Sequence, residues 1–188
     1  DVASVEITPQ HLTLTAPEAY ERLKGYAQMN PPIRGIEHQN ALWRGIAMGI
    51  ADVLGSDHAP HTAEEKARPY PASPSGMPGV QTLCAVMLTH VAEGRLTLER
   101  FVDLTSHGPN RVFGMANKGR LAEGYDADIT LVDLKARKTI VHADMASRVG
   151  WTPFDGFEAK GWPVATIIRG KLIMQDGEIV LPHAGEPV

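Results

Sequence analysis

Two short apolar segments that alternate with helical patterns constrain the fold of this chain more than any other feature. Residues 2–7 and 53–57 contain the β-branched and apolar residues typical of strands. Between them, over residues 38–52, apolar residues recur at helical spacing. Strands that alternate with helices form parallel sheets and barrels. Since two strands cannot close a barrel, we expect the C-terminal part of a larger (β/α)8 barrel.

Further helices are expected around these segments. A short helix is predicted over residues 17–24, and a Pro-rich loop over residues 58–79. A second long helix should begin near Val80, a third should be capped by Thr97, and Pro109 should open a short one. The first part of the chain is therefore predicted to be of α/β class.

The hydrophobic periodicity changes in the last third of the chain. Residues 127–133 alternate apolar and polar side chains, as a strand does. Residues 166–180 predict two strands and a hairpin at Asp176–Gly177, a preferred two-residue turn. We therefore divide the chain into a barrel portion, residues 1–118, and a small β-sandwich-like domain with a C-terminal tail, residues 119–188.

Composition excludes several classes of protein. With 18 basic and 22 acidic residues, the net charge is −4, which argues against nucleic acid or an anionic membrane as the main partner. No apolar run approaches the ~20 residues of a membrane span, and no secretory signal is visible. One cysteine, Cys84, excludes an internal disulfide and a cysteine-based zinc cage. We expect a cytoplasmic protein.

The densest group of reactive side chains follows the second predicted strand. Asp57, His58 and His61 provide one carboxylate and two imidazoles within five residues. In βα folds the loops after the strands converge on the active site. A carboxylate placed there can ligate a divalent metal and take a proton from metal-bound water. Alternatively, Asp57 caps a turn and the histidines are ordinary loop residues. The concentration of such chemistry after a buried strand favours function.

Two more polar residues are candidates for the same site. Glu6 lies within the first predicted strand, where an unpaired charge is unfavourable. Either it points to the barrel mouth beside a cation, or the strand is less buried than its sequence indicates. Asn30 precedes two prolines, which restrict its backbone and suit an amide aimed at a ligand. The alternative is a simple turn residue.

Other polar residues are interpreted as structural or solvated. Cys84 shares a predicted helix face with Met87 and should belong to the core. Gln10 and His11 are expected to be structural. The remaining basic residues considered are expected to be solvated rather than catalytic: Lys24, Arg34 and Lys66.

These motifs resemble those of a known family. Residues 55–62, Gly-Ser-Asp-His-Ala-Pro-His-Thr, followed by Glu-Glu-Lys at 64–66, resemble bacterial dihydroorotases of the amidohydrolase superfamily. The segment Met-Asn-Pro-Pro-Ile-Arg at 29–34 fits the same family. Residues 6–12 look like its seventh strand segment. Residues 119–128 and 160–164 look like parts of its small β domain.

The resemblance implies a zinc hydrolase with one or two ions that interconverts N-carbamoyl-L-aspartate and dihydroorotate in pyrimidine synthesis. By this resemblance Asp57 ends the eighth barrel strand and binds one zinc. Asp57 would also act as general base and acid, passing a proton between hydroxide and substrate nitrogen. Glu6 aligns with an acidic residue that touches an additional metal in some relatives.

The resemblance also implies which residues bind the substrate. His61 and Asn30 would hold its carboxylate and the polar groups of its ring. The segment around Ser75 and Gly76 would close over the substrate through backbone groups. The family further suggests a homo-oligomer, in some members together with aspartate carbamoyltransferase.

The chain departs from the family in its metal ligands. The His-x-His pair of dihydroorotases does not occur in these residues, and Asp57 is the one convincing zinc ligand where about three are needed. We therefore expect a C-terminal part of a dihydroorotase that is inactive without the missing N-terminal barrel segment. Two alternatives stay open: a hydantoinase or allantoinase, and a non-catalytic scaffold subunit of aspartate carbamoyltransferase.

Overall fold

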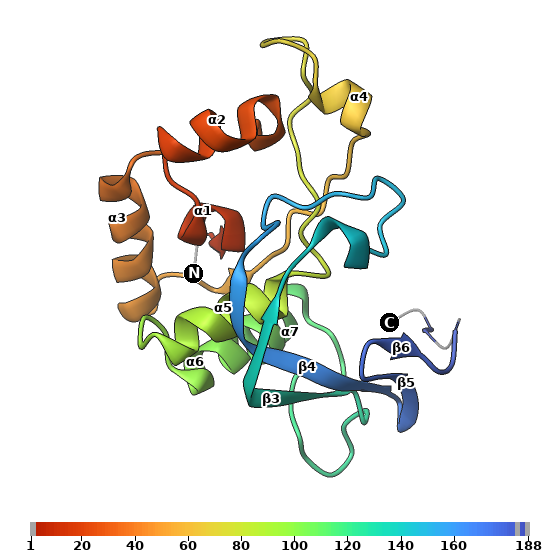
Figure 1. Ribbon diagram of the computed structural model, residues 1–188. Coiled ribbons are helices and arrows are strands. Elements are labelled where there is room, and N and C mark those ends of the chain that lie inside the picture. The colour runs from red at the N-terminus through yellow and green to blue at the C-terminus, as the bar shows by residue number, and fades with distance from the viewer. Residues whose placement is uncertain (1–2, 183–184, 187–188) are drawn as a thin grey trace. The chain divides into compact units, whose positions relative to one another are not determined.

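The computed structural model describes residues 3–182 and 185–186, which form two compact units (Figure 1). One, here called the strand-pair unit, contains Val5–Leu83 and Thr139–Glu158. The other, the sheet unit, contains Asp1–Ser4, Cys84–Lys138 and Ala159–Val188. Each unit is described by itself.

The strand-pair unit is built on two very short parallel strands. β1 is Glu6–Ile7 and β2 is Val53–Leu54, with Glu6 opposite Val53 and Ile7 opposite Leu54. Main-chain hydrogen bonds extend the pairing on both sides, from Asp52 N–H to the Val5 carbonyl (2.8 Å) and from Gly55 N–H to the Ile7 carbonyl (3.0 Å).

Both strands are shorter than the sequence predicts. β1 ends because the side chain of Thr8 caps the next helix, accepting a hydrogen bond from His11 N–H. β2 ends before residues 55–57, where Asp57 adopts a left-handed backbone conformation (φ 44°). The first residue of the strand expected over 2–7, Val2, lies outside the described part of the chain.

The helices of residues 5–82 follow these strands or connect them. They are α1 (Pro9–Thr13), α2 (Glu18–Leu23), a 3-10 turn (Lys24–Ala27), α3 (Ile36–Ala47) and α4 (Ala63–Lys66).

Two of these helices differ from their predictions. The helix predicted over 38–52 ends five residues early because Gly49 turns the chain out of the helix with φ 76°. α4 lies within the loop predicted over 58–79.

The segment Thr139–Glu158, with a 3-10 turn at His142–Asp144, belongs to the strand-pair unit through side-chain contacts. The indole N–H of Trp151 donates to the His61 carbonyl (2.8 Å), and Arg22 donates to the Pro153 carbonyl (3.2 Å). The compact units therefore do not coincide with a division at 118/119, since this later segment packs on residues of the first part. The limits 1–118 and 119–188 stay a prediction for the domains.

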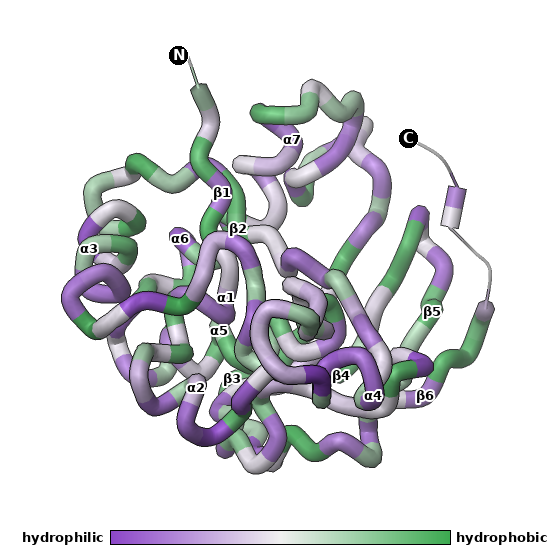
Figure 2. The backbone as a smooth tube through the Cα atoms, turned by 90° about the horizontal axis from the view of Figure 1, so that it is seen from above, coloured by the Kyte–Doolittle hydropathy of each residue, from purple (hydrophilic) through white to green (hydrophobic). Residues whose placement is uncertain are grey.

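The helices of the sheet unit follow the predicted order. α5 (Leu83–Ala92) has six of its ten residues buried. It consists largely of apolar residues, as the colouring of Figure 2 shows. α6 (Leu98–Val102) begins at Thr97, whose side chain accepts a hydrogen bond from Arg100 N–H, so the predicted cap is confirmed. A π-helical turn (Asp103–His107) leads into α7 (Gly108–Phe113).

The sheet has four strands in the order β3-β4-β5-β6 (Figure 1). They are β3 (Ile129–Thr139), β4 (Glu158–Ile168), β5 (Lys171–Gln175) and β6 (Glu178–Ile179). The hairpin at Asp176–Gly177 is confirmed, because Gln175 pairs with Glu178.

Within the described residues the second layer of a sandwich is not seen. Several large apolar side chains of this sheet are exposed: Leu131, Leu134, Leu172 and Ile179. The sandwich-like description stays a prediction.

Among residues 3–182 and 185–186, every helix is too short or too polar to cross a bilayer.

Candidate active site

The candidate site begins where β1 and β2 end. Because the strands are parallel and in register, their carboxyl ends lie at one edge, and the chain leaves β2 through Gly55, Ser56 and Asp57. The Ser56 carbonyl accepts a hydrogen bond from the fully buried side chain of Gln10 (2.9 Å). This bond fixes the main chain one residue before Asp57.

Glu6 lies against the start of the same loop. A Cβ atom on Gly55 would come within 2.3 Å of the Glu6 carboxyl group, so this carboxyl group covers the Gly55 Cα. Glu6 is also exposed. Of the two interpretations of Glu6, the structure favours the less buried strand, and it places the carboxylate near the loop that carries Asp57.

Asp57 is exposed, and its carboxylate has no recorded hydrogen bond or ion pair to the described residues. Its positive φ of 44° is a conformation that aspartate tolerates better than most residues. Strained backbone of this kind is frequent at functional sites. The side chain is therefore available to a ligand.

The two histidines of the motif have different roles. Nδ1 of His58 accepts hydrogen bonds from the N–H groups of Gly79 (3.1 Å) and Val80 (3.4 Å), so this ring holds a loop. Nε2 of His61 lies 3.0 Å from the Ser75 carbonyl oxygen. Because a carbonyl only accepts, Nε2 carries a proton. Nδ1 of His61 then faces Glu65 at 3.9 Å.

The segment Ser75–Gly76 is held close to the motif. A Cβ atom on Gly76 would lie 2.7 Å from both the Cβ and the carbonyl oxygen of Ala59, and Gly76 has φ 126°. Only glycine fits this approach without strain. The Ala59 N–H in turn donates to the Met77 carbonyl (3.1 Å). The structure thus brings together His61, Ser75 and Gly76, three of the residues predicted for the site.

Asn30 is exposed on a loop that His11 fastens to α1. Nε2 of His11 donates to the Pro31 carbonyl (2.8 Å), and its Nδ1 lies 2.7 Å from the Thr8 hydroxyl. The structural role expected for His11 agrees with these bonds. The amide of Asn30 has no recorded bond to a described residue, and so it can serve a ligand.

Asn30 and Ser75 line one cavity of about 800 Å³, together with aromatic and basic side chains. Asp57 and Glu6 do not line this cavity. The structure therefore divides the predicted residues into two groups: the carboxylates at the strand ends, and the polar groups of the loops. In the second group Asn30 and Ser75 line the cavity, and His61 does not line it but bonds to the Ser75 carbonyl. The other side chains prominent in the cavity are Tyr20, Tyr26, Lys66, Arg68 and Tyr70.

One residue of this region was misjudged from sequence. Lys66, expected to be solvated, has 0% of its surface exposed. It ends α4, which Thr62 and Glu65 start with a reciprocal capping box. The Thr62 backbone N–H, which bonds to the Glu65 carboxylate, holds the pKa of that carboxyl below its usual value. The T-x-x-E spacing was the available signal for this helix.

The described residues do not complete a metal site. Within residues 3–182 and 185–186, no three His, Cys, Asp or Glu side chains are arranged to hold an ion. A catalytic zinc needs about three protein ligands, whereas this chain presents the carboxylate of Asp57 with Glu6 nearby. Cys84 is half-buried, and burial raises the pKa of its thiol to about 11, which makes it a poor nucleophile.

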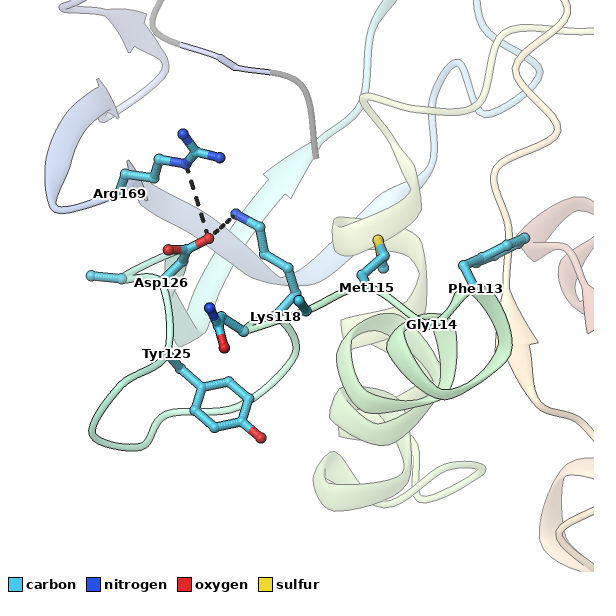
Figure 3. A pocket seen from close by; sticks show the side chains of 10 residues that line it. Phe113, Gly114, Met115, Lys118, Tyr125, Asp126 and Arg169 are labelled. Carbon is cyan, nitrogen blue, oxygen red and sulfur yellow. Dashed lines mark ion pairs between the residues drawn. The ribbon is translucent and has the colours of Figure 1, made fainter.

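A second cavity, of about 780 Å³, lies in the sheet unit (Figure 3). The Lys118 ammonium lies 2.8 Å from the Asp126 carboxylate, and Arg169 approaches the same carboxylate at 3.9 Å. The hydrogen bonds that Lys118 donates to the Asp126 and Asp128 carboxylates raise the pKa of this lysine. These charges neutralise one another, so the cavity presents a balanced ion-pair network rather than a reactive group.

Comparison with known proteins identifies the family to which this chain belongs. The Amidohydrolase family profile matches residues 6–173, and the chain belongs to this family. Membership, with structural neighbours among hydantoinases, places it in a (β/α)8-barrel superfamily.

Individual relatives narrow the comparison. A dihydroorotase of Methanosarcina acetivorans is 43% identical over 96% of this chain and 39% of its own length. A dihydroorotase of Halalkalibacterium halodurans is 41% identical over 94% of this chain and 41% of its own. The solved L-hydantoinase (dihydropyrimidinase) of Arthrobacter aurescens matches with a TM-score of 0.91 and 34% identity, over 95% of this chain and 40% of that one. This chain thus spans about 40% of the length of the relatives it matches.

Proposed function

We propose that this chain contributes part of the active site of a dihydroorotase, which interconverts N-carbamoyl-L-aspartate and dihydroorotate. The observation that carries the proposal is the free carboxylate of Asp57 at the end of β2, in a motif that also binds the Ser75–Gly76 loop through His61. Identities of 41–43% to dihydroorotases support this substrate.

In this proposal Asp57 moves the proton. Ring opening forms a bond between a water oxygen and the amide carbonyl carbon, and it breaks the bond from that carbon to the ring nitrogen. The Asp57 carboxylate accepts the proton that the water loses and returns it to the leaving nitrogen. Ring closure runs through the same steps in reverse. An exposed carboxylate that no described residue engages in a hydrogen bond suits this exchange.

The loops are proposed to bind the substrate. Asn30 and His61 hold its carboxylate and the polar groups of its ring, and the backbone at Ser75 and Gly76 covers it. The shared cavity of Asn30 and Ser75 supports this assignment. Since the proton of His61 Nε2 is already donated to the Ser75 carbonyl, a substrate carboxylate that binds there must replace this bond.

We propose zinc as the metal, with Asp57 as one ligand and Glu6 near an additional ion. The described residues supply too few ligands. The other ligands would come from segments that the longer relatives have and that these residues do not include. In the same way, the described strands are proposed to be the last of a (β/α)8 barrel, followed by a small β domain. A homo-oligomer, a complex with aspartate carbamoyltransferase and a cytoplasmic location stay predictions.

A hydantoinase is the second candidate, favoured by the TM-score of 0.91 to the Arthrobacter aurescens enzyme. The test uses a polypeptide of the relatives' full length that contains these residues. It is assayed with dihydroorotate, N-carbamoyl-aspartate, a 5-substituted hydantoin and allantoin, with metal content measured alongside. The proposal is supported if turnover of dihydroorotate and N-carbamoyl-aspartate exceeds turnover of the hydantoin and of allantoin by at least a hundredfold. Preference for a hydantoin or allantoin would replace it, and a metal-loaded protein inactive on all four would favour the scaffold subunit.

A further inference from the structure

Lys66 is a fully buried lysine whose ammonium group, among the residues that the structure describes, bonds only to main-chain oxygens. Its Nζ donates to the carbonyl oxygens of Gln28 (2.9 Å), Pro74 (2.7 Å) and Gly76 (2.9 Å). It forms no ion pair with a described carboxylate. Three protons therefore meet three acceptors, which satisfies the group completely.

The three acceptors belong to the two loops proposed to bind substrate. Gln28 lies two residues before Asn30, while Pro74 and Gly76 stand on either side of Ser75. The carbonyl of Ser75, between them, points instead to His61. The loop 74–76 is thus held by Lys66 through two carbonyls and by His61 through the third.

The loops also contact each other at this point. The Gly76 N–H donates to the Gln28 carbonyl at 2.9 Å, so one carbonyl oxygen accepts from both Gly76 and Lys66. On the other side, a Cβ atom on Gly25 would lie 2.4 Å from the Lys66 carbonyl oxygen. The Ser73 hydroxyl also lies within hydrogen-bonding distance of this carbonyl (3.3 Å). Lys66 is therefore fixed at both its main chain and its ammonium.

A buried ammonium is costly, and its presence needs a reason. Desolvation opposes the charge, and burial lowers the pKa of Lys66 to about 8. The charged form, with all three donors, still predominates at neutral pH. An apolar side chain of similar length would fill the space without this cost, but it would leave three carbonyl oxygens without their donor. The ammonium group therefore serves to hydrogen-bond the loops rather than to fill space in the core.

We propose that Lys66 is a positioning residue that sets the distance between the Asn30 loop and the Ser75–Gly76 loop, and thereby substrate affinity. This inference rests on the proposed function, because it takes these loops as the substrate-binding walls. Lys66 itself need not touch the substrate. It links α4, which starts directly after the His61 motif, to both walls of the cavity.

The test compares Lys66→Met with Lys66→Arg, and uses Lys171→Met as the matched control. Lys171 is an exposed lysine on β5 of the sheet unit, whereas both loops belong to the strand-pair unit. All variants are made in the metal-loaded polypeptide of the relatives' full length. The first readout is hydrogen exchange of the Gly76 and Ala59 amides, which needs no substrate. The second is KM and kcat for dihydroorotate, and for a hydantoin if the wild type prefers one.

Lys66→Met should speed exchange at Gly76 and Ala59 and raise KM by about 10- to 100-fold, with a smaller change in kcat. Lys66→Arg, which keeps N–H donors, should recover part of the affinity, and Lys171→Met should behave as wild type. Unchanged exchange or unchanged KM in Lys66→Met would overturn the proposal. If Lys66→Met does not fold, Lys66→Gln, which keeps two donors, replaces it under the same criteria. Failure of the wild type on all substrates would instead refute the proposed function, and the exchange result would still decide whether Lys66 orders the loops.

Discussion

The imidazole Nε2 of His61 lies 3.0 Å from the carbonyl oxygen of Ser75 and donates a proton to it. The main chain of the same histidine is also held, because its carbonyl accepts a hydrogen bond from the Trp151 indole at 2.8 Å. Trp151 in turn packs edge-on against Tyr26, with ring centroids 4.9 Å apart. His61 is thus held at its main chain by Trp151, and its ring bonds to the loop that is proposed to cover the substrate.

Replacing His61 with Ala should therefore weaken substrate binding more than turnover. The change removes the proposed carboxylate partner and releases the Ser75 loop, so KM should rise by about tenfold or more while kcat changes less. The KM of His61→Gln, which keeps an N–H donor, should lie between that of the wild type and that of His61→Ala. Steady-state kinetics in both reaction directions make the comparison. A fall in kcat at constant KM would assign His61 to the chemical step instead.

Asp57→Asn should act on turnover. Asparagine keeps the size and one oxygen but cannot accept and return a proton near neutral pH. We expect kcat to fall by ~10² to 10⁴-fold, with metal content measured to separate weaker metal binding from lost proton transfer. Asp176→Asn is the control, since Asp176 also has a positive φ, of 52°, but lies in the turn between β5 and β6. Full metal content with unchanged turnover in Asp57→Asn would remove Asp57 from the mechanism.

Gly76→Ala should destabilise the chain through a clash with Ala59. The added Cβ would lie 2.7 Å from the Ala59 carbonyl oxygen, which cannot move without disturbing the motif. Gly124, with φ 83° and open space around it, is the matched control. We expect about 1 kcal/mol for the positive φ in Gly124→Ala and roughly 1–3 kcal/mol more in Gly76→Ala. Urea unfolding measures both, and equal losses would contradict the clash.

The sequence predicted those features that local chemistry determines. Thr97 caps α6 and Asp176–Gly177 turns a hairpin because a hydroxyl or a positive φ is sufficient for these structures whatever surrounds them. The motif at Asp57 was placed after a strand because Val53 and Leu54 form a short apolar run that ends in glycine and polar residues. Both strands of the pair were predicted too long, since pairing with neighbours decides strand length more than propensity does.

Lys66 shows what the sequence could not predict. Its burial depends on three carbonyl oxygens at residues 28, 74 and 76, and main-chain acceptors leave no signature in a sequence. A four-residue helix is also too short for a hydrophobic period to reveal its buried face. The same limit applies to the segment 139–158, whose packing on His61 and Arg22 follows from long-range side-chain bonds.

His90 provides a prediction about stability that is independent of the proposed activity. It lies on α5 with only 4% of its surface exposed. Burial, helped by the positive charge of Arg95 and opposed by Glu93, lowers the pKa of His90 from 6.5 to about 4. Between these pH values the unfolded chain binds a proton that the folded chain does not. The free energy of unfolding should therefore fall as the pH is lowered from 6.5 to 4, and the contribution of His90 to this fall should level off below 4.

The loss assigned to His90 is roughly 3 kcal/mol over this range. It is measured by urea unfolding at pH 7, 5.5 and 4 in the wild type and in His90→Gln, whose side chain does not titrate. The variant should be less stable at pH 7, because its amide is buried in place of the imidazole, but it should lose less stability on acidification. His38→Gln is the control, since His38 is exposed on α3, and it should keep the wild-type pH dependence. If His90→Gln and the wild type lose the same free energy of unfolding between pH 6.5 and 4, His90 is not the cause of the loss of stability in acid.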